Sequence, residues 1–170
     1  GSEITIYTKW YDNISIAGNY YGFLFYDRNL KTGYDYSRYT DAKKMTLTAD
    51  GWISGNVKSA RAIEFDAESG KLTLLGTNNR YIQYVKCGGY EFLLVAVNSN
   101  SKIQSEIPTS DWNVYIFVKG DSAPASMTAT PYYGEKKADL TINGKTFNIS
   151  FITCTAEEAG TNKIFTVTEA

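Results

Sequence analysis

Residues 90–98 read YEFLLVAVN, and this stretch decides the fold class. The two-residue alternation of a β-strand places apolar side chains on both of its faces, with Phe92, Leu94 and Ala96 on one side and Leu93, Val95 and Val97 on the other. A strand that is apolar on both faces is usually central and covered on both sides. Residues 112–118, WNVYIFV, have the same character. We therefore expect both segments to be central strands with little exposure on either face.

Strand patterns separated by turn signals fill the rest of the chain. Asn143-Gly144 stands between two alternating segments, residues 139–142 and 146–153, and favours a type I′ hairpin. Pro131 cannot donate to a ladder, so residues 127–133 are expected to form an edge strand.

These patterns together define the expected fold. About eleven short strands without intervening helical patterns predict an antiparallel β-sandwich of the jelly-roll or immunoglobulin-like kind. A closed, lipocalin-like barrel is the alternative.

Composition limits the classes of protein to consider. Residues 1–2 read as an expression scar, and residues 3–170 fit a single domain. With 43% hydrophobic and 21% charged residues, the chain is globular. The net charge of −1 lacks the basic excess expected of a nucleic-acid binder. No apolar run approaches the ~18 residues of a membrane span, so membrane insertion is not expected.

Residues that carry chemistry are few. The chain has no histidine, which excludes His-based triads and His-ligated zinc. Asp27, Asp35 and Asp41 share one segment, but their spacing matches neither an EF-hand loop nor a glycosidase pair. We expect no catalytic residue, no metal site and no cofactor. Structural calcium stays open as an alternative, although no motif supports it. Cys87 and Cys154 can be two free thiols or one disulfide, and the sequence leaves both open.

Residues 27–41 are a long polar segment that follows the strand pattern of residues 19–26 and carries three tyrosines. Its candidate ligand-binding residues are Tyr34, Asp35, Tyr36, Arg38 and Tyr39. A pyranose presents an apolar C–H face, which a flat aromatic ring covers, and a rim of hydroxyls, which polar side chains hydrogen-bond. The segment is therefore a candidate sugar-binding surface.

Four further aromatic residues join the candidate site. Trp52 follows the Asp50-Gly51 turn, Trp112 begins a strand, and Tyr132-Tyr133 form a pair on the expected edge strand. One ring of that pair must point outward, because successive residues of a strand alternate between its faces.

The pattern predicts a non-catalytic carbohydrate-binding module of a secreted or cell-surface protein, within a larger multidomain protein. Its expected partner is a neutral polysaccharide or oligosaccharide, such as an α- or β-glucan of the starch or cellulose type, because the near-zero net charge offers no field for a polyanion. One alternative is a structural or adhesin domain of a bacterial surface protein. Another is a lipocalin-like binder of a small ligand.

Overall fold

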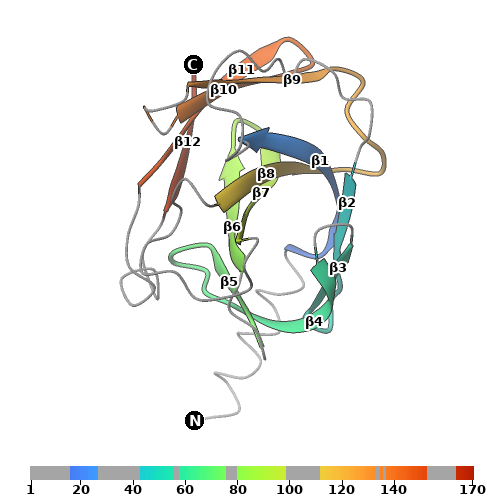
Figure 1. Ribbon diagram of the computed structural model, residues 1–170. Coiled ribbons are helices and arrows are strands. Elements are labelled where there is room, and N and C mark those ends of the chain that lie inside the picture. Colours follow the sequence, from blue (N-terminus) through green and yellow to red (C-terminus); the bar gives the residue numbers. More distant parts are fainter. Residues whose placement is uncertain are drawn as a thin grey trace.

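The computed structural model describes residues 16–26, 43–55, 58–75, 80–98, 112–132, 135, 137–152 and 164–170. These residues form an all-β, antiparallel fold (Figure 1). Its strands are β1 (Gly18–Tyr26), β2 (Lys43–Leu47), β3 (Trp52–Gly55), β4 (Lys58–Phe65), β5 (Lys71–Leu74), β6 (Arg80–Cys87), β7 (Tyr90–Asn98), β8 (Trp112–Lys119), β9 (Met127–Tyr132), β10 (Lys137–Ile142), β11 (Lys145–Phe151) and β12 (Phe165–Glu169). No helix within the described ranges is long and apolar enough to cross a membrane.

The first eight strands close into a barrel. Each strand from β1 to β8 pairs with the next in sequence, and β8 returns to pair with β1 through contacts such as Tyr20 with Lys119. At Gly22 the two strands approach so closely that a Cβ atom would lie 1.7 Å from the carbonyl oxygen of Ile116. Closure removes the free edges that an open sheet of these strands would expose.

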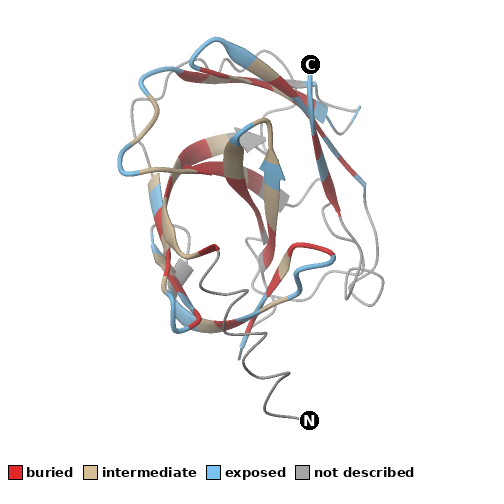
Figure 2. Ribbon diagram, turned by 180° about the vertical axis from the view of Figure 1, so that it is seen from behind, coloured by how far each residue is buried: buried red, intermediate tan, exposed pale blue. Residues whose placement is uncertain are grey.

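Apolar side chains fill the described interior of the barrel. The buried cluster comprises Ile16, Tyr20, Met45, Leu47, Ile53, Ile63, Leu72, Leu74, Ile82, Leu93, Val95 and Phe117. Figure 2 shows buried stretches along the ribbon of the barrel. Tyr20, Met45 and Phe117 have no exposed surface, which leaves no room for a ligand between them.

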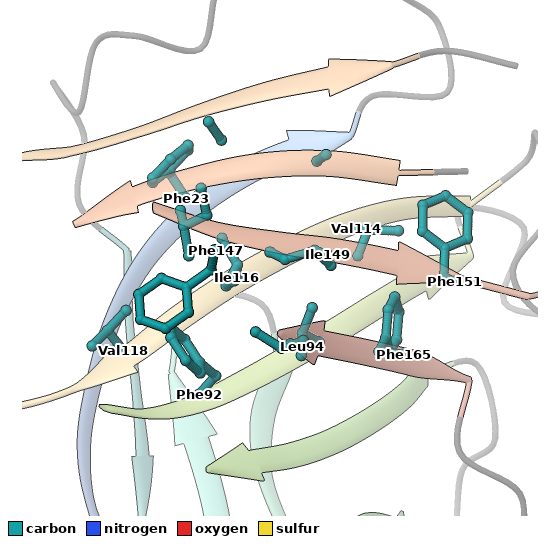
Figure 3. Close-up of a cluster of buried hydrophobic side chains, with 14 of the residues drawn as sticks. Phe23, Phe92, Leu94, Val114, Ile116, Val118, Phe147, Ile149, Phe151 and Phe165 are labelled. Atoms are coloured by element: carbon teal, nitrogen blue, oxygen red, sulfur yellow. The ribbon is translucent and has the colours of Figure 1, made fainter. Parts of the chain in front are cut away.

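The last four strands form a separate sheet in the order β12-β11-β10-β9. Figure 1 shows this sheet lying across one side of the barrel. Its inner face packs on the outer face of the barrel, and Phe147 from the sheet meets Phe92 from the barrel edge-to-face at 5.4 Å between ring centroids (Figure 3). Apolar side chains from both layers make this second core continuous.

The two central segments have two buried faces, as predicted. In β7, Leu93 and Val95 point into the barrel, whereas Phe92, Leu94 and Ala96 point toward the four-stranded sheet. The all-β antiparallel class is confirmed, and the closed-barrel alternative fits the structure. The jelly-roll or immunoglobulin-like sandwich is not confirmed, because one of the two layers is a wall of a closed barrel.

The turn and edge predictions are also confirmed. Asn143 and Gly144 both have positive φ, as a type I′ turn requires. β9 is an edge strand, and Pro131 lies opposite Ala138 on it. The carbonyl of Ser126, which directly precedes β9, accepts a hydrogen bond from the backbone N–H of Asn143. Ladder hydrogen bonds alternate along an antiparallel strand, so the odd-numbered residues of β9 direct their backbone groups away from β10. The Pro131 nitrogen therefore faces the open edge. Proline therefore occupies a position where an N–H would have no ladder partner.

Gln83 joins the barrel to the four-stranded sheet. It points outward from β6, is 1% exposed, and lies beside the start of β12. Its Nε2 donates to the carbonyl of Phe165 at 2.8 Å, and its Oε1 accepts from the N–H groups of Phe165 and Ile164 at 2.9 and 3.1 Å. The side-chain amide thus takes the place of a neighbouring strand for one residue of β12.

Candidate functional site

The outer face of the four-stranded sheet is the candidate site, and we call it the polar sheet face. Alternation sends the apolar residues of β9–β12 inward and the remaining side chains outward. The outward residues are Thr128, Thr130, Tyr132, Lys137, Asp139, Thr141, Thr146, Asn148, Ser150, Thr166 and Thr168. Nearly all of them carry hydroxyl, amide or carboxylate groups on short side chains.

Strand pairing arranges these side chains in rows across the sheet. One row runs Tyr132, Lys137, Ser150 and Thr166; the next runs Thr130, Asp139, Asn148 and Thr168; a third contains Thr128, Thr141 and Thr146. Neighbours within a row are about 4.8 Å apart, and successive rows are about 7 Å apart. Donors and acceptors therefore form a regular array.

Tyr132 is the large aromatic ring of this face. The residue is 40% exposed, and its hydroxyl donates to Oδ2 of Asp139 at 2.6 Å. This hydrogen bond, together with the negative charge of Asp139, raises the pKa of the Tyr132 hydroxyl above its ordinary value. The phenol therefore stays neutral at physiological pH, and the bond fixes the orientation of the ring.

A shallow hollow lies beside Tyr132. It has a volume of about 410 Å³ and is lined by Tyr132, Glu135, Lys137, Ala138, Asp139, Asn148, Ile149 and Ser150. One aromatic wall and several polar groups of both signs surround the space. This combination can cover an apolar ring face while pairing with hydroxyl groups.

Among the predicted aromatic residues whose side chains the structure describes, Tyr132 is the one that combines exposure with contacts to other residues of a candidate site. Trp52 is also exposed, at 46%, but β3 lies on the side of the barrel away from the four-stranded sheet (Figure 1). The structure therefore does not bring Trp52 and Tyr132 together. Asp139, Asn148 and Ser150 were missed, although their alternation with buried neighbours already indicated an outward face.

The side chains of the remaining predicted site residues are not among those that the structure describes. Trp112 begins β8, but its side chain is not described. Tyr34, Asp35, Tyr36, Arg38, Tyr39 and Tyr133 are outside the described residues, as are Asp27 and Asp41. Their part in binding stays a prediction.

Strand direction nevertheless separates two of the predicted tryptophans. Trp112 opens β8 opposite Asn98, at the end of the barrel where β1 finishes and β2 begins. Trp52 opens β3 next to the end of β2, which is paired with the start of β1. The backbones of the two residues therefore lie at opposite ends of the barrel.

A second polar cluster lies at the end of the barrel where β1 starts. The hydroxyl of Tyr84 donates to Glu91 Oε1 at 2.6 Å, and Lys119 Nζ lies 3.5 Å from the same oxygen. The hydroxyl of Tyr20 donates to the carbonyl of Ile16 at 2.6 Å. Burial, followed by the charge of Glu91, raises the pKa of Tyr20. Each of these groups therefore already has a partner within the protein.

Comparison of this chain with protein families, curated proteins and solved structures found no match.

The described residues contain no group of three or more Cys, Asp or Glu side chains placed to hold a metal ion. Cys87 carries a free thiol, so the structure has no disulfide at this position. Cys154 is outside the described residues.

Proposed function

We propose that the protein is a non-catalytic carbohydrate-binding domain that holds a neutral polysaccharide on the polar sheet face. The observation that carries the proposal is the exposed Tyr132 ring, fixed by Asp139 beside an array of short polar side chains. Fixing the ring before binding lowers the entropic cost of ordering it around a ligand. As part of the same proposal, the protein is extracellular or on a cell surface and belongs to a larger assembly of domains.

The composition of the face supports a neutral ligand. Lys137 is offset by Asp139 and Glu135 around the hollow, and most other outward groups are uncharged hydroxyls. A polyanion would need a field of one sign, which these residues do not provide. A neutral glucan instead needs hydroxyl pairing and a ring to stack on, and both are present.

We predict that Tyr132→Ala weakens polysaccharide binding about thirtyfold, or ~2 kcal/mol, because stacking against the ring is lost. Tyr132→Phe should keep most of the affinity, because it retains the ring and removes only the bond to Asp139. Affinity electrophoresis through gels containing starch, cellulose-type or mixed-linkage glucans measures both effects. The melting temperature of both variants should stay close to that of the parent, because the side chain is exposed.

Trp52→Ala is the matched control. It removes an exposed ring from the side of the barrel away from the polar sheet face, so retention should be unchanged. Normal retention of Tyr132→Ala together with loss in Trp52→Ala would move the site to the barrel. Absence of retardation of the parent protein in every glucan gel would reject the proposed function.

The second candidate is a lipocalin-like binder of a small apolar ligand, which the closure of the first eight strands into a barrel supports. The buried side chains that fill the described part of the barrel interior argue against it. Native mass spectrometry of the purified protein tests this candidate, since a bound apolar molecule would add a fixed mass that disappears on denaturation.

A further inference from the structure

The hollow beside Tyr132 is a trough that runs across the strands of the four-stranded sheet. Ala138 on β10 and Ile149 on β11 pair with each other and point their side chains into the core, so their backbone forms the floor of the trough. The outward residues on either side of this pair form two walls, Lys137 with Ser150 and Asp139 with Asn148. Each wall joins a residue of β10 to its direct partner on β11, so the trough lies perpendicular to the strands.

The trough is bounded by an aromatic ring at β9 and continues toward β12. Tyr132 belongs to the row of one wall, and its hydroxyl bonds to Asp139 in the other wall, so its side chain crosses the trough. On β12 both walls continue as Thr166 and Thr168, which are exposed and pair with the wall residues of β11. A ligand that begins at Tyr132 can therefore follow the two walls across four strands, a length of about 14 Å.

The third row of the polar sheet face lies outside this trough. Thr141 and Thr146, on β10 and β11, are partly buried, and their hydroxyls hydrogen-bond to each other at 3.0 Å. The wall residues Lys137, Asn148 and Ser150 are instead exposed. The exposed polar groups of β10 and β11 are therefore concentrated along the trough, across the strands.

We infer that the polysaccharide is an extended, cellulose-type β-glucan whose chain runs across the strands in this trough; the inference rests on the proposed function of the polar sheet face. The spacing of neighbouring strands, about 4.8 Å, is close to the advance per glucose unit of an extended β-1,4-linked chain, so one unit can lie over each strand. The first unit packs against the ring of Tyr132. Hydroxyls project from both edges of such a chain, where the two walls supply donors and acceptors.

The same geometry argues against two other kinds of polymer. A starch-type α-glucan is helical, so its chain bends away from a straight trough within a few units and loses contact with the walls. A polyanionic chain would need one sign of charge along its path. Lys137 and Asp139 instead place opposite charges on the two walls at β10.

Titration calorimetry of the full chain with cellobiose, cellotetraose and maltotetraose tests the type of chain. Cellotetraose should bind about tenfold more tightly than cellobiose, because the longer chain also reaches hydrogen-bonding groups on β11 and β12. Maltotetraose should bind about tenfold more weakly than cellotetraose, because it cannot follow both walls. Equal or tighter binding of maltotetraose, or equal binding of cellobiose and cellotetraose, would overturn the inference and leave the proposed function in place.

Two double variants test the direction of the chain. Thr166→Ala with Thr168→Ala removes both wall hydroxyls of β12 and should weaken cellotetraose binding about tenfold, while cellobiose, which does not reach β12, binds as before. The matched control is Thr141→Ala with Thr146→Ala, which removes two hydroxyls of the same face outside the trough and should leave cellotetraose binding unchanged. The reverse result would place the chain along the strands and overturn the inference.

A measurement on the parent protein keeps the test decisive if a double variant does not fold. In the full chain labelled with ¹⁵N, saturating cellotetraose should shift the amide resonances of Asn148, Ser150 and Thr166 more than that of Thr146. Larger shifts at Thr146, or an unshifted Thr166, would overturn the inference. Absence of binding by both tetrasaccharides and in every glucan gel would instead reject the proposed function, and the inference with it.

Discussion

Replacing Phe147 with alanine should lower the free energy of unfolding by about 3–5 kcal/mol, because it deletes a fully buried ring between two packed layers. The ring contacts Phe92 and also meets Tyr90 edge-to-face at 5.8 Å between centroids. The turn at Gly88 is packed tightly against this ring, since a Cβ on Gly88 would lie 2.7 Å from Phe147 Cε1. We therefore expect the backbone to have little freedom to close the cavity that the lost ring leaves. Urea denaturation followed by far-UV circular dichroism measures the change.

The neighbouring residue provides the control for register. Asn148 is exposed on the polar sheet face, so Asn148→Ala should change stability by less than about 0.5 kcal/mol. Phe151→Ala should behave like Phe147→Ala, because its ring is buried against Phe165. If Asn148→Ala were the more damaging change, β11 would present its other face to the core.

Gln83→Leu should cost about 3 kcal/mol or more, although leucine has a similar volume and is apolar. The substitution leaves three buried backbone groups, at Ile164 and Phe165, without partners, and each orphaned group costs about 1–3 kcal/mol. Thermal and urea melts measure the loss, and amide exchange at Phe165 should rise with it. A neutral result would mean that β12 is held by apolar packing alone.

Gln83→Glu separates the donor from the acceptor in this contact. The new carboxylate can accept from the N–H groups of Ile164 and Phe165, but at neutral pH it faces the carbonyl of Phe165 without a proton. Burial raises the folded-state pKa of such a group above its unfolded value of about 4.3, so stability is lost as pH rises and recovered as pH falls. The difference in free energy of unfolding between Gln83→Glu and the parent should therefore become smaller as pH falls toward about 4.

Local patterns predicted the strands well because side-chain alternation records which face is buried. The two apolar faces of residues 90–98 and 112–118 are enough to predict central strands, and Pro131 is enough to predict an edge strand. β3 was not predicted, since four residues, WISG, are too short to show alternation. Closure of the barrel is only an alternative at the level of sequence, because it depends on pairing β1 with β8, and no local signal specifies a partner about 100 residues away.

The candidate site was predictable only in part. Alternation required one of Tyr132 and Tyr133 to point outward, and Tyr132 does so. The partner of Tyr132, Asp139, lies on a neighbouring strand, so their hydrogen bond depends on a register that the sequence does not display. The role of Gln83 could not be predicted from the sequence. Gln83 is a lone polar residue on an apolar face, and its role depends on the backbone of a strand about 80 residues later.

The closure of the barrel has a consequence for how the chain folds. Strands β9, β10 and β11 join through short connections, and most barrel strands pair with their neighbours in sequence, so these contacts close small loops. The pairing of β1 with β8 must instead close a loop of about 100 residues, at a higher entropic cost. We expect this seam to form last. Pulse-labelled hydrogen exchange during refolding should protect amides of β10 and β11 before those that join β1 to β8, and simultaneous protection would contradict that order.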